Sequence, residues 1–141
     1  MTEIVDNQRK IKIETEDFQA FAESAVDSVK EAKGKSATIA FVSDWKMRGL
    51  NKIFRGKNAT TDVLSFPFEA DAFEAGENNL GDIIISVEQA QKQAKENDLD
   101  FETEIKQLIL HGVLHLCGYD HETDNGEMNK IELKLREKLG I

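Results

Sequence analysis

The three histidines of this 141-residue chain, His111, His115 and His121, all lie within eleven positions. His111 and His115 are four residues apart, so on a helix their side chains stack on one side, about 6 Å apart. One nitrogen from each ring can then meet a single metal ion at about 2.0–2.1 Å. Gly118 can end such a helix in a left-handed conformation and turn the chain back, which brings His121 toward the same point. The spacing predicts a metal site with three histidine ligands.

The same offsets occur in metzincin proteases, which carry H-E-x-x-H-x-x-G-x-x-H. The protease's general-base glutamate is replaced here by Gly112, so the carboxylate needed for peptide hydrolysis is missing. Three protein ligands with an open fourth position are typical of catalytic rather than structural zinc. Cys117 is the nearest fourth candidate, but it lies two residues after His115 on a helix and points elsewhere, so we expect a small buried apolar residue. The pattern favours a catalytic metal site that is not a peptidase.

A helix over residues 101–117 must carry the first two histidines, because apolar residues recur there at helical spacing. For several side chains near this helix, the sequence allows two interpretations each. Asp120 either fixes a histidine tautomer or helps to begin the last helix beside Thr123 or Asp124. Tyr119 either reaches substrate or is a half-buried aromatic residue. Asp62 and Ser65 either face the cleft or satisfy loop backbone.

Three upstream segments predict strands. Residues 37–43 are short, apolar and β-rich, and residues 80–86 are typical of a fully buried strand. Residues 62–68 alternate in polarity, and Pro67 restricts them to a sheet edge or a strand end because proline cannot donate to the ladder. A polar, glycine-containing loop is expected over residues 69–79.

The helix starts have their own signals. Ser43 or Asp44 should begin a helix through the basic stretch that follows, and Ser86 with Gln89 predicts a capping box. Near the N-terminus, a strand is expected within residues 4–13, around RKIKIE. Thr15 should then cap a helix that stops near residue 34.

These elements predict an α/β or α+β fold in which a small mixed sheet of about four strands packs with about five helices, with the histidine site at the end of a core helix. The length and a composition of 40% apolar and 32% charged residues favour one domain over residues 1–141. No apolar run approaches the roughly 20 residues that cross a bilayer, no signal peptide is evident, and the lone cysteine cannot form an internal disulfide. We therefore expect a cytoplasmic protein with no membrane partner.

The formal net charge of −9 argues against nonspecific coating of nucleic acid, because the whole-molecule field repels phosphate. Residues 46–57 differ, since they hold five cations and no acidic residue. These cations are Lys46, Arg48, Lys52, Arg55 and Lys57. Such a run alone is usually a solvated helix face. A metal ion held by neutral imidazoles keeps its full charge and attracts anionic oxygen. A run of cations beside such an ion favours a phosphodiester substrate whose developing charge is stabilised by an arginine.

The segment HGVLHLCGYDH, residues 111–121, resembles the YbeY family of bacterial endoribonucleases, whose motif is H-G-x-L-H-L-x-G-Y-D-H. LNKIFRGKNATTDVLSFPF, residues 50–68, is similar to the family's stretch ending T-D-V-L-S-F-P, and residues 80–86 resemble the strand that follows. Together the blocks cover roughly half of the chain in the family's order. One departure is Thr60, where the family often has proline, and it concerns the rigidity of the loop.

The resemblance implies a metal-dependent endoribonuclease that acts on single-stranded RNA, in 16S ribosomal RNA 3′-end maturation and quality control of 70S ribosomes. Ribosomal RNA and the small ribosomal subunit are the implied partners, and no DNA is expected. Carried over by position, His111, His115 and His121 would hold one ion per chain, Zn²⁺ being the expected metal. Arg55 and His115 would be the catalytic residues. The substrate-binding set would be Arg48, Lys52, Arg55 and Lys57, with Asp120 and Tyr119 behind the metal ligands.

Two other interpretations stay open. A ribosome-associated RNA-binding or assembly module with a structural zinc should lose its fold without metal, whereas a catalytic site should keep its fold and lose its activity. A metzincin-like hydrolase is disfavoured by Gly112, and a panel of substrates separates it from a ribonuclease.

Overall fold

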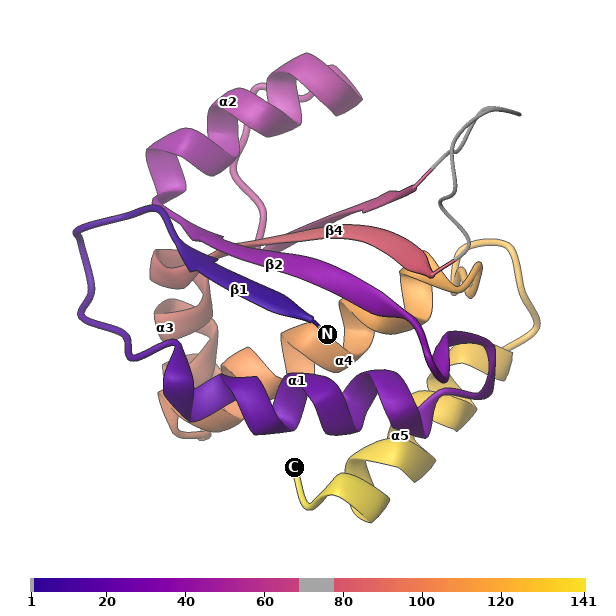
Figure 1. The fold of residues 1–141 in the computed structure, drawn as a ribbon. Coiled ribbons are helices and arrows are strands. Elements are labelled where there is room, and N and C mark those ends of the chain that lie inside the picture. The colour runs from indigo at the N-terminus through magenta and orange to yellow at the C-terminus, as the bar shows by residue number, and fades with distance from the viewer. Residues whose placement is uncertain (1, 69–77) are drawn as a thin grey trace.

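The computed structural model describes residues 2–68 and 78–141, and it confirms the predicted mixed sheet with five helices (Figure 1). The elements in chain order are β1 (Glu3–Asp6), α1 (Glu16–Ser28), a 3-10 turn η1 (Lys30–Ala32), β2 (Ser36–Val42), α2 (Asp44–Arg55), β3 (Val63–Pro67), β4 (Asn79–Ser86), α3 (Val87–Glu96), α4 (Phe101–Leu116) and α5 (Glu127–Leu139). Figure 1 shows α2 on one face of the sheet and the other helices on the opposite face. Within these residues, no helix has the length and apolar character that a membrane span needs.

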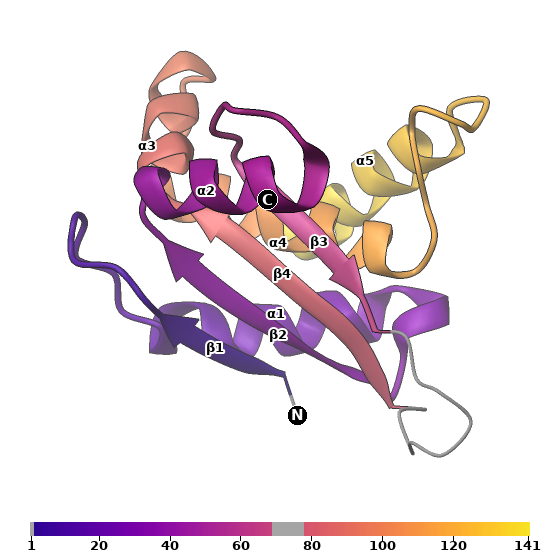
Figure 2. The same cartoon turned by 90° about the horizontal axis from the view of Figure 1, so that it is seen from above.

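The sheet has the strand order β1-β2-β4-β3, which Figure 2 shows from above. The first three strands in this order are parallel, and β3 runs antiparallel to β4 at the edge, as Pro67 predicted. Pro67 pairs with Gly81, whose φ is +128°. A Cβ at Gly81 would lie 2.2 Å from the Phe66 carbonyl oxygen, so only glycine lets the two strands meet here.

The main core lies between the sheet and the layer that contains α1 and α4. Ile83 and Ile85 of β4 are fully buried there, and the rings of Phe18 and Phe41 meet edge to face with centroids 5.8 Å apart. Helix α4 approaches β4 so closely at Gly112 that a Cβ there would lie 2.7 Å from Ile83 Cγ2. The missing side chain at residue 112 therefore sets the distance between the histidine-bearing helix and the sheet.

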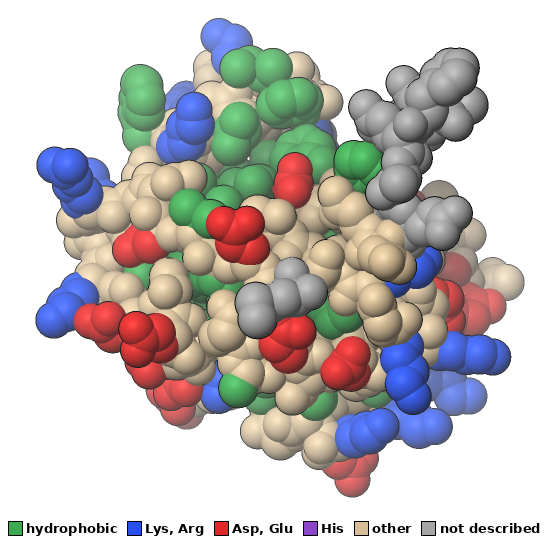
Figure 3. Space-filling model, in the orientation of Figure 1, with side chains coloured by type: hydrophobic (Ala, Val, Ile, Leu, Met, Phe, Trp, Pro, Cys, Tyr) green, Lys and Arg blue, Asp and Glu red, His purple; other side chains and the backbone are tan. Residues whose placement is uncertain are grey.

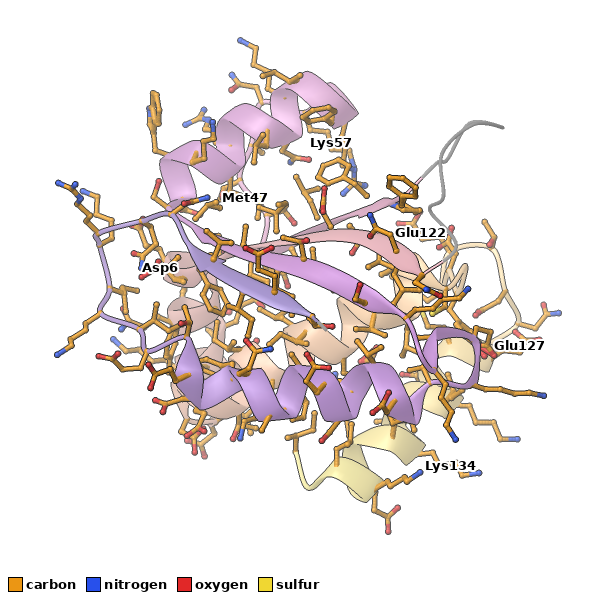
Figure 4. The ribbon with its side chains drawn as sticks, viewed as in Figure 1. Asp6, Met47, Lys57, Glu122, Glu127 and Lys134 are labelled. Atoms are coloured by element: carbon orange, nitrogen blue, oxygen red, sulfur yellow. The ribbon has the colours of Figure 1, made fainter. Side chains whose placement is uncertain are left out.

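Helix α2 covers the other face of the sheet through one side only. Met47 is fully buried and points from the helix toward the sheet (Figure 4), where it packs with Val42 and Leu64. The helix begins as predicted at Ser43, whose Oγ accepts a hydrogen bond from the Lys46 backbone N–H at 3.2 Å. The opposite side of α2 is exposed to solvent.

The predicted position of the first strand was wrong. Strand β1 is Glu3–Asp6, which pairs with β2, whereas RKIKIE forms no strand. The Gln8 side chain accepts from the Lys10 and Ile11 backbone N–H groups and donates to the Ile11 carbonyl, which stabilises a bend instead. The alternating isoleucines of this segment pack against the core as part of a connection.

Three details of the helix termini also differ from prediction. The Thr15 side chain makes no cap hydrogen bond, and α1 ends at Ser28 because residue 29 is extended, short of residue 34. Ser86 Oγ accepts from the Gln89 backbone N–H at 3.3 Å, but the Gln89 amide donates to Asp44 and leaves the capping box half formed. The last helix begins at Glu127 with Gly126 as its N-cap, and Asp124 stabilises its first turn because the Asp124 carboxylate accepts from the Met128 N–H at 2.8 Å. The loop expected over residues 69–79 lies mostly outside the described residues.

Candidate metal centre

The three histidines lie together, as their spacing predicted. The side-chain nitrogens of His111, His115 and His121 that could bind one ion are all within 4.8 Å of one another. His111 and His115 occupy the last two turns of α4, and their Nε2 atoms are 3.0 Å apart. The ring of His121 packs 5.8 and 5.7 Å from the other two ring centroids. Three imidazoles thus converge on one point.

The turn after α4 explains how His121 reaches the helix end. Gly118 has a φ of +94°, and its N–H donates to the His115 carbonyl at 3.0 Å. The Tyr119 N–H donates to the Leu114 carbonyl at 3.1 Å. This pair of bonds is a Schellman motif, which reverses the chain directly after a helix. The helix ends at residue 116, one residue earlier than predicted.

A carboxylate from α5 sets the tautomer of His111. The Nδ1 of His111 donates to Glu132 Oε1 at 2.6 Å, which leaves the Nε2 lone pair facing the other histidines. Burial raises the pKa of Glu132, but the bonds to His111 and Arg136 outweigh it and hold the pKa below its usual value. Arg136 Nη2 donates to Glu132 Oε2 at 2.7 Å. Metal-binding imidazoles need such an acceptor on the second ring nitrogen, so the donor set fits a metal ion.

The sequence interpretation assigned this tautomer role to Asp120 as one of two readings, and Glu132 was missed. The Asp120 carboxylate accepts from the Glu122 backbone N–H at 2.9 Å and stabilises the turn. A signal for Glu132 was present in the last helix, because it lies four residues after Met128 and three before Leu135, both buried. A charged residue inside an apolar helical stripe indicates a paired or functional group.

The surroundings of His115 favour its neutral form. Burial lowers the pKa of its imidazole, and the neighbouring His111 and His121 rings lower it further, while Asp120 acts in the opposite direction. A lowered pKa keeps the ring unprotonated at neutral pH, so a nitrogen lone pair is available.

The histidines open into a cleft of about 510 Å³ between β3, the α4 terminus and the turn that follows. Several residues singled out from the sequence line it. They are Arg55, Asp62, Ser65, Tyr119 and Asp120. Arg48, Lys52 and Lys57 are exposed and do not line this cleft; Lys57, labelled in Figure 4, follows the end of α2. Of the five cations in residues 46–57, Arg55 is therefore the one that lines the cleft of the histidines.

Tyr119 connects the turn to another part of the fold. Its hydroxyl donates to Glu31 Oε1 at 3.1 Å, across 88 positions of sequence. Burial raises the pKa of Tyr119, and the Glu31 carboxylate raises it further. The hydroxyl is therefore engaged with η1, and the ring packs against the core.

The loop between Arg55 and β3 is tied down by Asp44. Its carboxylate accepts hydrogen bonds from the Thr60 hydroxyl, from Ser86 Oγ at 3.0 Å and from Gln89 Nε2 at 3.1 Å. Burial raises the pKa of Asp44, but these bonds outweigh it and lower the pKa overall. Thr60 replaces the proline frequent in the resembling family, and its hydrogen bond restores an anchor to this loop.

A second cavity, of about 580 Å³, meets the cleft at Asp62 and His111. The Gln93 amide, oriented with its NH₂ toward the carboxylates, donates to Asp62 Oδ2 at 3.1 Å and to Glu104 Oε1 at 3.0 Å. Burial raises the pKa of Glu104, and Asp62 raises it further. The cavity thus holds a buried acid next to the three histidines.

The chain matches the family model described as Endoribonuclease YbeY over residues 3–140. The Endoribonuclease YbeY of Alkaliphilus metalliredigens is 37% identical over 147 residues, covering 98% of this chain and 95% of the relative. That of Caldanaerobacter subterraneus is 36% identical over 157 residues, covering 100% and 99%. A solution structure from Thermotoga maritima has a TM-score of 0.65 and 26% identity, covering 99% of this chain and 89% of that one. The chain belongs to the endoribonuclease YbeY family, which confirms the resemblance.

Proposed function

We propose that this chain is a metal-dependent endoribonuclease that cuts single-stranded RNA, with residues 1–141 acting as one catalytic domain. The observation that carries the proposal is the convergence of three imidazoles in a cleft that also receives Arg55. A cationic guanidinium beside a metal centre suits a phosphodiester substrate. Membership of a family named for endoribonuclease activity supports the same substrate class.

The proposed ion is zinc, one per chain, held by His111, His115 and His121. Three neutral imidazoles with room for a further ligand match catalytic zinc, which when bound supplies a Lewis acid and lowers the pKa of water. Cys117 is not proposed as a fourth ligand. Among the described residues, the group of side chains whose ligand atoms lie close enough to hold one ion contains the three histidines and not Cys117.

The chain's own residues take distinct roles in this proposal. Glu132 holds the Nδ1 proton of His111, so that Nε2 stays directed at the ion site. Arg55 pairs with phosphate oxygens and stabilises the negative charge that builds on them in the transition state. His115 contributes a ligand that is neutral at the working pH. Arg48, Lys52 and Lys57 contact the RNA outside the cleft.

We further propose that the substrate is ribosomal RNA, in 16S 3′-end maturation and ribosome quality control, and that the chain acts in the cytoplasm with the small ribosomal subunit. The net charge of −9 supports a substrate presented by a larger assembly, because free RNA is repelled by the protein as a whole. A metzincin-like peptidase is disfavoured, since Ile83 occupies the space that a glutamate at residue 112 would need.

The test measures bound metal and RNA cleavage in the same preparations, purified without a histidine tag. Wild type, His111→Ala and the control Asn125→Ala, an exposed residue in the adjacent loop, are compared by elemental analysis. We expect one zinc per chain in wild type and control, loss in His111→Ala, and cleavage that stops on chelation while circular dichroism is retained. Metal retained by His111→Ala would refute the ligand assignment. Unfolding on chelation would support the alternative in which zinc is structural. Cleavage of peptides in place of RNA would support the metzincin-like hydrolase.

A further inference from the structure

Helix α2 carries large apolar side chains that are exposed to solvent. Trp45 is 84% exposed, Ile53 75% and Phe54 61%, and these are three of the five large hydrophobic residues exposed in residues 2–68 and 78–141. Figure 3 shows hydrophobic and basic side chains gathered together over α2, at the top of the view. Phe54 lies seven residues after Met47, so it shares the sheet-facing side of the helix, and Ile53 is turned about 80° away from Trp45. Trp45 is therefore the large apolar side chain on the outer side, and an exposed tryptophan beside cations indicates a binding surface.

Three of the four cations of α2 lie on the same side as Trp45. Trp45, Arg48, Lys52 and Arg55 follow the spacing i, i+3, i+7 and i+10, so they form one stripe along the helix. Met47 lies on the opposite, buried side. In the described part of the chain, no salt bridge uses a cation of residues 46–57. The stripe therefore presents positive charge on a protein whose net charge is −9.

The stripe ends in the cleft of the metal centre. Arg55 lines that cleft, and beside it the Phe54 ring meets Phe66 of β3 edge to face, with centroids 5.0 Å apart. Arg55 lies ten positions after Trp45, which is about 15 Å along a helix. A single strand with about 3.4 Å per nucleotide covers that distance in about four or five nucleotides.

We propose that Trp45, Arg48 and Lys52, here called the α2 track, bind the single-stranded RNA that leaves the cleft. One base stacks on the Trp45 indole, and the two cations pair with phosphates between Trp45 and Arg55. A positively charged path with an aromatic side chain on which a base stacks is the pattern by which proteins hold single strands, whereas the centre of a protein docking surface is depleted in charge. The identity of the ligand as RNA rests on the proposed function.

The only tryptophan of the chain lies on the α2 track, so its fluorescence reports on this surface alone. The full chain is titrated with 2′-O-methyl oligonucleotides, which keep the bases and phosphates but resist cleavage. We expect an oligonucleotide of about twelve nucleotides to quench Trp45 on binding, and one of about three to bind without quenching because it does not reach from the cleft. A long oligonucleotide that binds without changing Trp45 fluorescence would overturn the track.

Substitutions at Trp45 separate base stacking from apolar docking. Fluorescence anisotropy of an end-labelled long oligonucleotide should show at least about fivefold weaker binding for Trp45→Ala, with wild-type affinity for Trp45→Phe. Trp45→Leu keeps an apolar surface without a π-face and should bind as weakly as Trp45→Ala. Leu133→Ala, on α5, is the matched control, since Leu133 is also exposed at 54%. Equal affinity of Trp45→Leu and wild type would overturn the stacking.

A cleavage assay in parallel keeps the two proposals distinguishable. Quenching by RNA in a chain that cleaves no RNA would support the α2 track and count against the ribonuclease. Metal-dependent cleavage with Trp45 unaffected by any oligonucleotide would leave the ribonuclease in place and overturn the track, and the apolar face would then belong to a protein partner.

Discussion

Replacing Glu132 by Gln tests whether this buried carboxylate prepares His111 for metal binding. The substitution keeps the size of the side chain and removes its negative charge. Glu132 is 7% exposed and lies between the His111 imidazole at 2.6 Å and the Arg136 guanidinium at 2.7 Å. The change therefore leaves at most a neutral acceptor for His111 and removes the carboxylate charge that pairs with Arg136, in a poorly solvated place.

The expected loss of zinc affinity follows from the hydrogen bond that His111 Nδ1 makes to Glu132. Loss of a carboxylate that holds a ligating histidine costs about 10- to 100-fold in metal affinity, which is about 1.4–2.8 kcal/mol of binding free energy. Asp120→Asn is the matched control, because Asp120 also lies in the cleft but bonds to the Glu122 backbone N–H. For Asp120→Asn we expect a change within about twofold.

Competition with a chromogenic zinc chelator measures both affinities, and urea unfolding of the metal-free proteins checks that the variants remain folded. The assay has two refuting results. Zinc affinity equal to wild type in Glu132→Gln would show that the carboxylate does not act on the metal site. An equal loss in Asp120→Asn would show that only the overall negative charge of the cleft matters, with no role for the hydrogen bond to His111.

Other expectations follow from single contacts. Gly112→Ala should lower the free energy of unfolding in urea by about 1–2 kcal/mol, because crowding of Ile83 outweighs a gain of about 1 kcal/mol in helix propensity; an unchanged value would contradict the close approach. Arg55→Ala should reduce kcat for RNA cleavage on the order of 100-fold with metal content unchanged, and wild-type kcat would remove it from the site. Metal should dissociate as pH falls, because protons compete for the imidazoles. The pKa of His115 is lowered, so this ring becomes protonated at a lower pH than an ordinary histidine, and full metal occupancy at pH 4 would exclude a three-histidine site. Glu104→Gln should stabilise the protein at pH 7. Because the pKa of Glu104 is raised in the folded state, the wild type loses stability as the pH rises above the carboxyl's ordinary pKa of 4.5. The difference between the urea midpoints of the two proteins should therefore vanish below about pH 4, and a difference that does not depend on pH would refute this explanation.

Local sequence carried much of the fold because local geometry decides those features. Proline cannot donate to a ladder, so Pro67 had to lie at an edge, and β3 is an edge strand. Ser43 caps α2 through a bond to the Lys46 N–H, three residues away. Local reasoning predicted the wrong position for the first strand. Glu3–Asp6 forms a strand because it pairs with β2, some 35 positions away, and no local alternation of polarity encodes that pairing.

The sequence by itself determined the convergence of the three histidines, since a helical i, i+4 pair and a left-handed glycine are properties of eleven consecutive residues. Only the tertiary structure decided what surrounds them. Glu132 reaches His111 because α5 packs beside α4, and Arg55 reaches the cleft because α2 lies across the sheet. Such contacts depend on how helices pack on a sheet, and they join residues whose sequence separation carries no geometric information.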